Sequence, residues 1–157
     1  MQNPVNFLVY TGSPGCGKTY FCAALTEWSG RTFNTRRYHR EESLLRKLRQ
    51  GISDGSGDYL IALEYMIDDD FVILDDVASG INPDKTTYRD LEFRREVFFS
   101  FLDYRYNTQK PTVITSNLTR QQFKDVYSER IASRLYASEN TIIEMFGDDL
   151  DKRGKGM

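Results

Sequence analysis

The feature that most constrains this chain is a glycine-rich stretch, GSPGCGKT at residues 12–19, which directly follows the apolar run FLVY. Its three glycines allow a tight turn with inward-pointing backbone N–H groups, and such a turn before a helix forms a cradle for phosphate oxygens. In this pattern Lys18 reaches the β- and γ-phosphates, and the Thr19 hydroxyl ligates Mg²⁺. We therefore expect a nucleotide site made of Gly12, Ser13, Pro14, Gly15, Cys16, Gly17, Lys18, Thr19 and Tyr20.

A second stretch, FVILDD at 71–76, offers the carboxylates that such a site needs. Four apolar residues followed by two acids indicate a buried parallel strand, and open α/β sheets bind ligands at the C-terminal ends of their strands. We expect Asp75 to hold Mg²⁺ through water and Asp76 to orient or polarise the attacking water. The alternative is a charged strand end that caps the next turn.

A third stretch, PTVITSNLT at 111–119, repeats this arrangement of an apolar strand that ends in polar residues. Asn117 is expected beside the γ-phosphate, where its amide can hydrogen-bond the phosphate or the attacking water. From spacing alone, a turn or N-cap role for this asparagine fits equally well.

Composition limits the class of protein. A chain of 157 residues with 39% hydrophobic residues predicts one domain over 1–157, with a flexible polar tail at about 147–157. The two cysteines, six residues apart, suggest neither a disulfide framework nor a zinc site. No long apolar run or signal-like N-terminus is present, so we expect a cytoplasmic protein without a membrane partner. The net charge of −2 argues against a uniformly basic DNA-coating protein and leaves room for a local basic patch.

Strand and helix patterns alternate along the chain, which predicts an α/β fold of three layers with a mainly parallel five-stranded sheet. The expected strands are 6–10, 31–35, 71–76, 111–116 and 140–146. The expected helices are 18–28, 40–52, 59–67, 89–108 and 128–135.

Four stretches, in this order and at these intervals, resemble one known family: GSPGCGKT, ILDDV, YRYNTQKPTVITSNLT and ERIASRL. They look like the AAA+ domain of the DnaC/DnaI helicase loaders and the related IstB transposition ATPases, over residues 5–153. The resemblance implies a P-loop NTPase without a separate C-terminal lid, which binds ATP or ADP with Mg²⁺. It also implies ATP hydrolysis, ATP-dependent self-association, a role in DNA replication, and a replicative helicase or a transposase as partner.

The resemblance also assigns roles to single residues. It makes Asn117 the sensor-1 residue and Arg130 an arginine finger, which is donated to the nucleotide of a neighbouring subunit. Arg134 lies one helical turn later and could share or replace that role. Arg153 matches the sensor-2 arginine only loosely. The alternative for Arg130 and Arg134 is an exposed helix face paired with Glu129 or Asp125.

The basic helix at 40–52 aligns with the family segment that contacts single-stranded DNA. Arg46, Lys47 and Arg49 are suited to phosphates, and Tyr38 to stacking on a base. Because Glu41 and Glu42 interrupt the basic run, a solvated helix face fits as well.

Two further functions stay open. A small P-loop kinase would use the same loop, but it needs an arginine-rich lid, for which the only candidate is the basic run at 36–49. A DNA-binding scaffold would bind nucleotide without turnover. Asp76 stands where most AAA+ proteins have glutamate, and its shorter side chain favours slow, switch-like hydrolysis.

Overall fold

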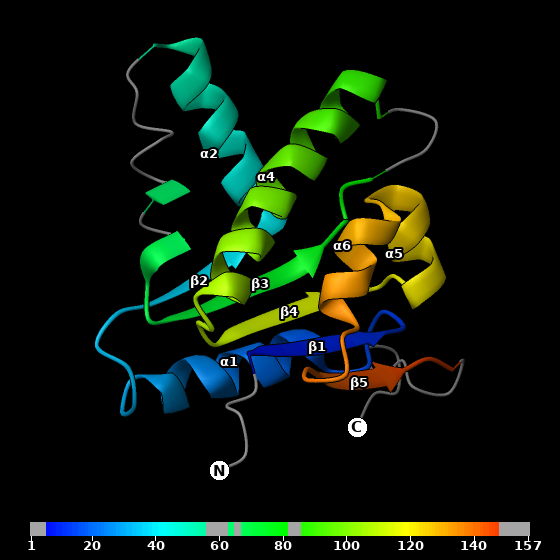
Figure 1. Cartoon of the computed structure of the whole chain (residues 1–157). Helices are drawn as coiled ribbons and strands as arrows, with labels where there is room; N and C mark the ends of the chain where they lie inside the picture. The colour runs from blue at the N-terminus through cyan, green and yellow to red at the C-terminus, as the bar shows by residue number, and fades with distance from the viewer. Residues whose placement is uncertain (1–5, 56–62, 65–66, 82–85, 148–157) are drawn as a thin grey trace.

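Five parallel strands form one sheet, in the order β2, β3, β4, β1, β5 (Figure 1). The computed structural model describes residues 6–55, 63–64, 67–81 and 86–147. The elements are β1 (Phe7–Gly12), α1 (Lys18–Ser29), β2 (Arg36–Arg40), α2 (Glu41–Ser53), β3 (Phe71–Val77), α4 (Tyr88–Asn107), β4 (Thr112–Ser116), α5 (Arg120–Val126), α6 (Glu129–Leu135) and β5 (Thr141–Met145). The predicted parallel five-stranded sheet is therefore confirmed.

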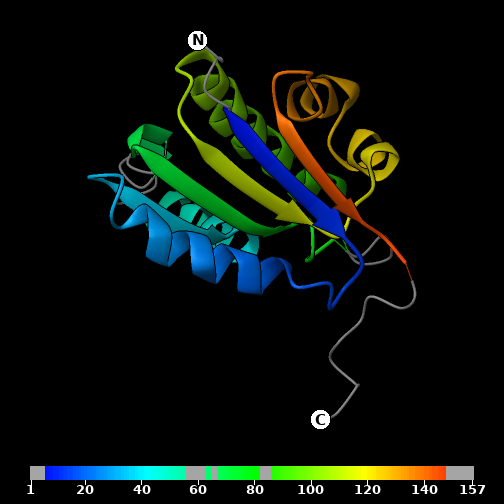
Figure 2. The same ribbon diagram turned by 90° about the horizontal axis from the view of Figure 1, so that it is seen from below.

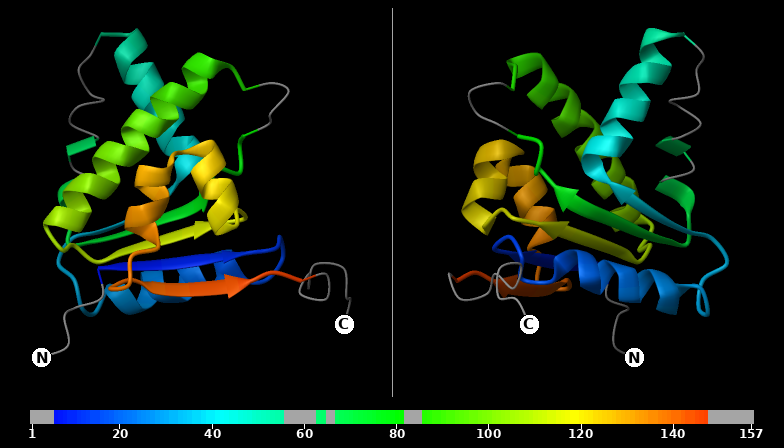
Figure 3. Two further views of the ribbon diagram at one scale, coloured as in Figure 1. Left: turned by 45° about the vertical axis from the view of Figure 1, so that its right-hand side comes forward. Right: turned by 180° about the vertical axis from the view of Figure 1, so that it is seen from behind.

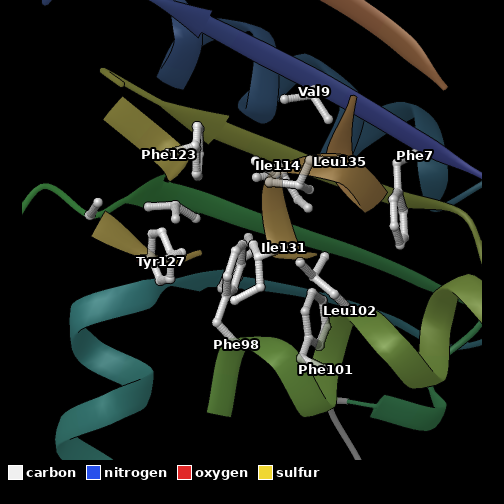
Figure 4. Close-up of a cluster of buried hydrophobic side chains, with 14 of the residues drawn as sticks. Phe7, Val9, Phe98, Phe101, Leu102, Ile114, Phe123, Tyr127, Ile131 and Leu135 are labelled. Carbon is white, nitrogen blue, oxygen red and sulfur yellow. The ribbon is translucent and has the colours of Figure 1, made fainter. Parts of the chain in front are cut away.

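The sheet separates two cores of unequal size. Strand side chains alternate between its faces, so that Val9 of β1 joins one core and the neighbouring Leu8 packs against the other. Helices α2, α4, α5 and α6 cover one face of the sheet, and α1 covers the other (Figures 2 and 3). The larger core lies under the four helices, and the smaller one lies under α1. Figure 4 shows the larger core, where aromatic and aliphatic side chains of β1, β4, α4, α5 and α6 meet. This arrangement gives the three layers that the sequence predicts.

Strand β2 is the element that the sequence pattern misplaced. We expected a strand at 31–35, but the backbone N–H groups of residues 31–33 donate to the carbonyls of Trp28 and Ser29 at the end of α1, and β2 begins at Arg36. Phe33, in the middle of that stretch, stacks on Phe71 with ring centroids 4.9 Å apart. Because β2 lies at the sheet edge and its sequence is RRYHR, no apolar alternation marks it.

Helix α5, which has seven residues, was missed by the sequence reading. Its signal is a capping box: the Thr119 hydroxyl accepts from the Gln122 backbone N–H, and the Gln122 side chain accepts from the Thr119 backbone N–H. The other expected helices in the described part of the chain agree with the structure to within about one residue. The helix expected at 59–67 lies mostly outside the described residues, as does most of the expected tail.

Two buried arginines fix α4 to its surroundings. Arg105 is fully buried, and its guanidinium donates to the Thr112 hydroxyl at 2.6 Å and to the backbone carbonyls of Ile67, Asp69 and Pro111 at 2.8–2.9 Å. Burial lowers the pKa of Arg105 to about 10. These bonds join the end of α4 to the starts of β3 and β4.

The second arginine, Arg94, belongs to a buried polar network around Glu41, the first residue of α2. Glu41 accepts hydrogen bonds from Arg94, from the Tyr127 hydroxyl at 2.5 Å and from the Ala78 backbone N–H at 2.7 Å. Burial raises the pKa of Glu41, although Arg94 opposes the shift. The network connects the segment after β3 with α2, α4 and the α5–α6 turn, and so fixes one side of the site described next.

The described helices include none that is both long and apolar enough to cross a lipid bilayer.

Candidate functional site

A cleft of about 830 Å³ lies at the C-terminal ends of the strands, where α1 begins. It is lined by Pro14, Gly15, Cys16, Gly17, Lys18, Thr19, Tyr20, Arg40, Asp76, Ser79 and Asn117. The glycine-rich loop, Asp76 and Asn117, which are far apart in the sequence, thus meet at one place. This is the edge of the sheet where parallel α/β folds bind ligands.

The loop between β1 and α1 has a backbone that requires glycine at two points. Gly17 caps α1 with φ of 99°, in the left-handed region that favours glycine. At Gly12 the limit is space, because a Cβ would lie 2.4 Å from the Met145 carbonyl oxygen. The Ser13 backbone N–H donates to that same carbonyl at 2.9 Å. The end of β5 therefore holds the loop in place, with the N-terminus of α1 at the cleft.

Lys18 lies inside the curve of this loop. Its side chain is buried, and its ammonium donates to the carbonyls of Gly12 at 2.7 Å and Ser13 at 3.0 Å. A positive charge and the N-terminal end of α1 thus face the same part of the cleft. Both favour an anion such as a phosphate group.

Asp75 is the most heavily hydrogen-bonded carboxylate of the site. It is buried and accepts from the Tyr38 hydroxyl at 2.6 Å, from the Thr115 hydroxyl, and from the Thr19 hydroxyl at 3.5 Å. Burial, followed by the bond to Asp75, raises the pKa of Tyr38 to about 12. Both hydroxyl groups of the Tyr38–Asp75–Thr115 chain thus orient the carboxylate.

The donor set near Asp75 fits Mg²⁺. Thr19 and Asp75 supply hard oxygen ligands from two elements, and Mg²⁺ in nucleotide sites needs only one or two protein oxygens besides phosphates and water. Within the described residues no cluster of three or more His, Cys, Asp or Glu side chains is placed to hold a metal by itself. The site therefore suits a metal that arrives with a phosphate ligand rather than a dedicated protein cage.

Asp76 has an unusual backbone. Its φ is 61°, and the pairing of β3 with β4 shifts register between Leu74 and Val77, so Asp75 and Asp76 form a bulge. The Asp76 N–H donates to the Thr115 hydroxyl at 2.9 Å. A non-glycine residue in this region costs about 1–3 kcal/mol, and such strain clusters at functional sites. Here the bulge places Asp75 against Thr19 and Asp76 at the cleft.

The structure adds three residues that the sequence reading did not assign to this site: Tyr38, Arg40 and Ser79. Tyr38 was expected to stack on a nucleic-acid base, but its hydroxyl is bound to Asp75. Arg40 and Ser79 line the cleft. A correct placement of β2 would have found Arg40, because it ends the strand next to β3 at the ligand-binding edge.

One family profile, described as IstB-like ATP binding protein, matches residues 2–136. The chain belongs to this family. A comparison with curated proteins gave no match. Among solved structures, the chain is similar to the DnaC helicase loader, with a TM-score of 0.70 and 22% identity over 91% of this chain and 79% of that one.

Two further solved structures share the fold. DnaI matches with a TM-score of 0.69 and 25% identity, over 87% of this chain and 71% of that one. The replication initiator DnaA, bound to AMPPCP and single-stranded DNA, matches with a TM-score of 0.72 and 20% identity. That match covers 96% of this chain but only 43% of DnaA. The predicted fold class, a P-loop AAA+ domain, is thus confirmed for this IstB-like protein.

Arg130 and Arg134 lie on α6, and neither lines the cleft. Both guanidinium groups lie over the ring of Phe99 in α4, at 4.2 Å for Arg130 and 5.2 Å for Arg134. Arg134 also pairs with Asp103 at 2.5 Å and is partly buried, whereas Arg130 is exposed. The two arginines are therefore not equivalent, which the sequence had left open.

The alternative partners of these arginines are occupied elsewhere. Glu129 pairs with Lys124 at 2.9 Å, and Asp125 accepts from Gln121 at 3.0 Å. Arg153, the loosely matched sensor-2 residue, lies outside the described residues.

The three basic residues of α2 also differ from one another. Arg46 and Lys47 are exposed. Arg49 pairs with Asp90 at 3.0 Å, and its guanidinium lies 5.1 Å from the centroid of the Phe93 ring. Arg49 is thus engaged with α4, and Arg46 and Lys47 remain the more accessible cations on this helix.

Proposed function

We propose that this IstB-like protein is a slow, Mg²⁺-dependent ATPase of the helicase-loader type, which assembles with ATP and contacts single-stranded DNA. The observation that carries the proposal is the single cleft that contains the loop, Lys18, Thr19, Asp76 and Asn117, with Asp75 behind Thr19. A phosphate cradle, metal-binding oxygens and a carboxylate for water are the parts that nucleotide hydrolysis needs.

Each residue has a distinct task in this proposal. The loop N–H groups and Lys18 bind the phosphates. Thr19 and Asp75 would hold Mg²⁺, which would supply positive charge beside the phosphates. Asp76 orients the attacking water. Asn117 hydrogen-bonds the terminal phosphate or that water and begins the connection to α5. The bulge at Asp75 and Asp76 supports this division of roles, because it lets two adjacent carboxylates serve different parts of the cleft.

The similarity to a helicase loader and to an initiator bound to single-stranded DNA supports a role in DNA replication. The family match equally supports a transposition ATPase, with a transposase in place of a replicative helicase as partner. The kinase alternative is weaker, because its candidate lid, the basic run at 36–49, forms β2 and most of α2, two regular elements of the fold.

The proposal is tested by measuring the mass of the protein in solution with a non-hydrolysable ATP analogue and Mg²⁺, with and without a short single strand of DNA. We expect a monomer without nucleotide, an oligomer with the analogue, and a further shift toward the oligomer with DNA. ADP serves as the control nucleotide. A protein that binds the analogue yet stays monomeric in every mixture would contradict ATP-dependent assembly, and phosphate transfer to a small acceptor would favour the kinase.

A double variant, Arg46→Ala with Lys47→Ala, tests the binding of DNA. The slope of log K against log salt is negative, and it becomes less steep by about 0.7 for each phosphate of a single strand that the protein no longer neutralises. We therefore expect weaker binding of single-stranded DNA and a slope smaller by about 1.4, measured by fluorescence anisotropy over a salt series. Arg49→Ala is the matched comparison, with a smaller expected effect because Arg49 is held by Asp90 and Phe93. An unchanged slope in the double variant would contradict DNA binding by α2 and favour the alternative that its basic face is simply exposed to solvent.

A further inference from the structure

Arg40 is a cation of the cleft to which no role has been given. It is the last residue of β2, and the parallel pairing of β2 with β3 sets Arg40 opposite Asp75. Paired residues of neighbouring strands point to the same face of a sheet. Thr19 and Cys22 of α1 both contact Asp75, so this is the face covered by α1. The register therefore places Arg40 on the same face as the metal-binding carboxylate.

The side chain of Arg40 is exposed and lines the cleft together with the loop residues, Asp76 and Asn117. Hydrogen bonding with the Tyr38 hydroxyl, helped by the charges of Asp75 and Asp76, raises the pKa of Arg40 above its ordinary value. Like any guanidinium, that of Arg40 is charged at every working pH. Among the described residues it forms no ion pair that would remove its charge from the cleft.

Two cations then line the cleft from different elements: Lys18 from α1 and Arg40 from β2. Lys18 lies within the loop, against the carbonyls of Gly12 and Ser13. Arg40 instead lies on the side of the two carboxylates that would hold the metal and the attacking water. A planar guanidinium binds phosphate oxygens in a bidentate manner, which a lysine ammonium does not.

We propose that Arg40 binds the terminal phosphate of ATP within its own subunit and thereby makes the site prefer ATP over ADP. The inference rests on the proposed function. It adds a cation that acts in cis, distinct from Arg130, which the resemblance to loaders assigns to a neighbouring subunit. Tyr38 supports this role as a positioning residue, because its hydroxyl donates to Asp75 at 2.6 Å and it lies on the same face of β2 as Arg40. A subunit that carries its own arginine senses the terminal phosphate before any assembly takes place.

The test is a set of dissociation constants, measured by calorimetry with Mg²⁺, for ADP and for a non-hydrolysable ATP analogue. In Arg40→Ala we expect the affinity for the analogue to fall about 10- to 100-fold, as for the loss of a charge-assisted hydrogen bond. The affinity for ADP should change less than about 2-fold, and Arg40→Lys should recover part of the loss. The melting temperature of each variant verifies that the fold is intact, and Arg40→Gln is a second neutral variant.

Arg36→Ala is the matched control. Arg36 lies on the same strand and the same face as Arg40 and carries the same charge, but it packs near Gly30 at the far end of α1. Its removal should leave both dissociation constants unchanged. Equal losses for ADP and the analogue in Arg40→Ala, or no loss for either, would overturn the role of Arg40 while nucleotide binding by the wild type stands. A wild-type protein that binds neither nucleotide would overturn the proposed function as well.

Discussion

Replacing Lys18 with alanine is expected to abolish nucleotide binding. In the structure the Lys18 ammonium is buried in the loop with the carbonyls of Gly12 and Ser13 as its acceptors, at the N-terminus of α1. Hydrogen bonds to charged groups contribute about 1.5–3 kcal/mol each. The loss of two such bonds to phosphate oxygens corresponds to an affinity at least about 100-fold lower. Calorimetric titration with ADP and with a non-hydrolysable ATP analogue measures this directly.

Lys47→Ala is the control for this experiment, since Lys47 is an exposed lysine of α2 and does not line the cleft. It should bind both nucleotides as the wild type does. The Lys18 side chain also donates to two loop carbonyls, so its removal could disturb the fold. Circular dichroism therefore verifies that the Lys18→Ala variant is folded. If a folded Lys18→Ala protein binds nucleotide with wild-type affinity, the glycine-rich loop is not the phosphate-binding part of the site.

Replacing Arg130 with alanine is expected to leave nucleotide binding intact and to remove ATP hydrolysis and ATP-dependent assembly. Arg130 is exposed on α6, does not line the cleft of its own chain, and contacts the ring of Phe99. An arginine supplied in trans to a phosphoryl-transfer site is worth about 10³- to 10⁵-fold in rate. Turnover by release of inorganic phosphate, alongside mass in solution with the ATP analogue, gives the two readouts.

Arg134→Ala separates the two arginines of α6. Because Arg134 pairs with Asp103 across to α4 and is partly buried, its loss should lower the melting temperature rather than act on turnover specifically. Arg130 holds no such pair in the described part of the chain, so its variant should melt as the wild type does. Normal turnover in Arg130→Ala would refute the finger assignment, and lost turnover in a stable Arg134→Ala protein would transfer the role to Arg134.

Much of this fold can be predicted from the sequence because its signals are local. The glycine spacing of residues 12–17 predicts the loop, and the apolar runs before Asp75 and Asn117 predict two strands, without any tertiary information. Strand β2 cannot be predicted in this way, because an edge strand of polar residues is defined by its pairing with β3 and has no apolar pattern of its own.

The candidate site shows the same division. The loop, Asp76 and Asn117, which the sequence singled out, line one cleft. Arg40 and Tyr38 depend on the register between β2 and β3, and the difference between Arg130 and Arg134 depends on Asp103, which lies 31 residues from Arg134. Such relationships are long-range and leave no trace in spacing. The bulge at Asp76 is likewise a property of strand pairing, not of the residues FVILDD alone.

The uneven division of the core has a consequence for how the molecule opens. Helix α1 buries three of its 12 residues, Lys18, Cys22 and Ser29, and its apolar contact with the sheet is the smaller of the two cores. Segments with few buried apolar contacts open at a lower free energy than the rest of a domain. A ligand that bridges the N-terminus of α1 and Asp75 would close this layer and stabilise it in proportion to the logarithm of ligand concentration. Nucleotide would then stabilise a layer that rests on the smaller core, and amide exchange in α1 would report the occupancy of the cleft.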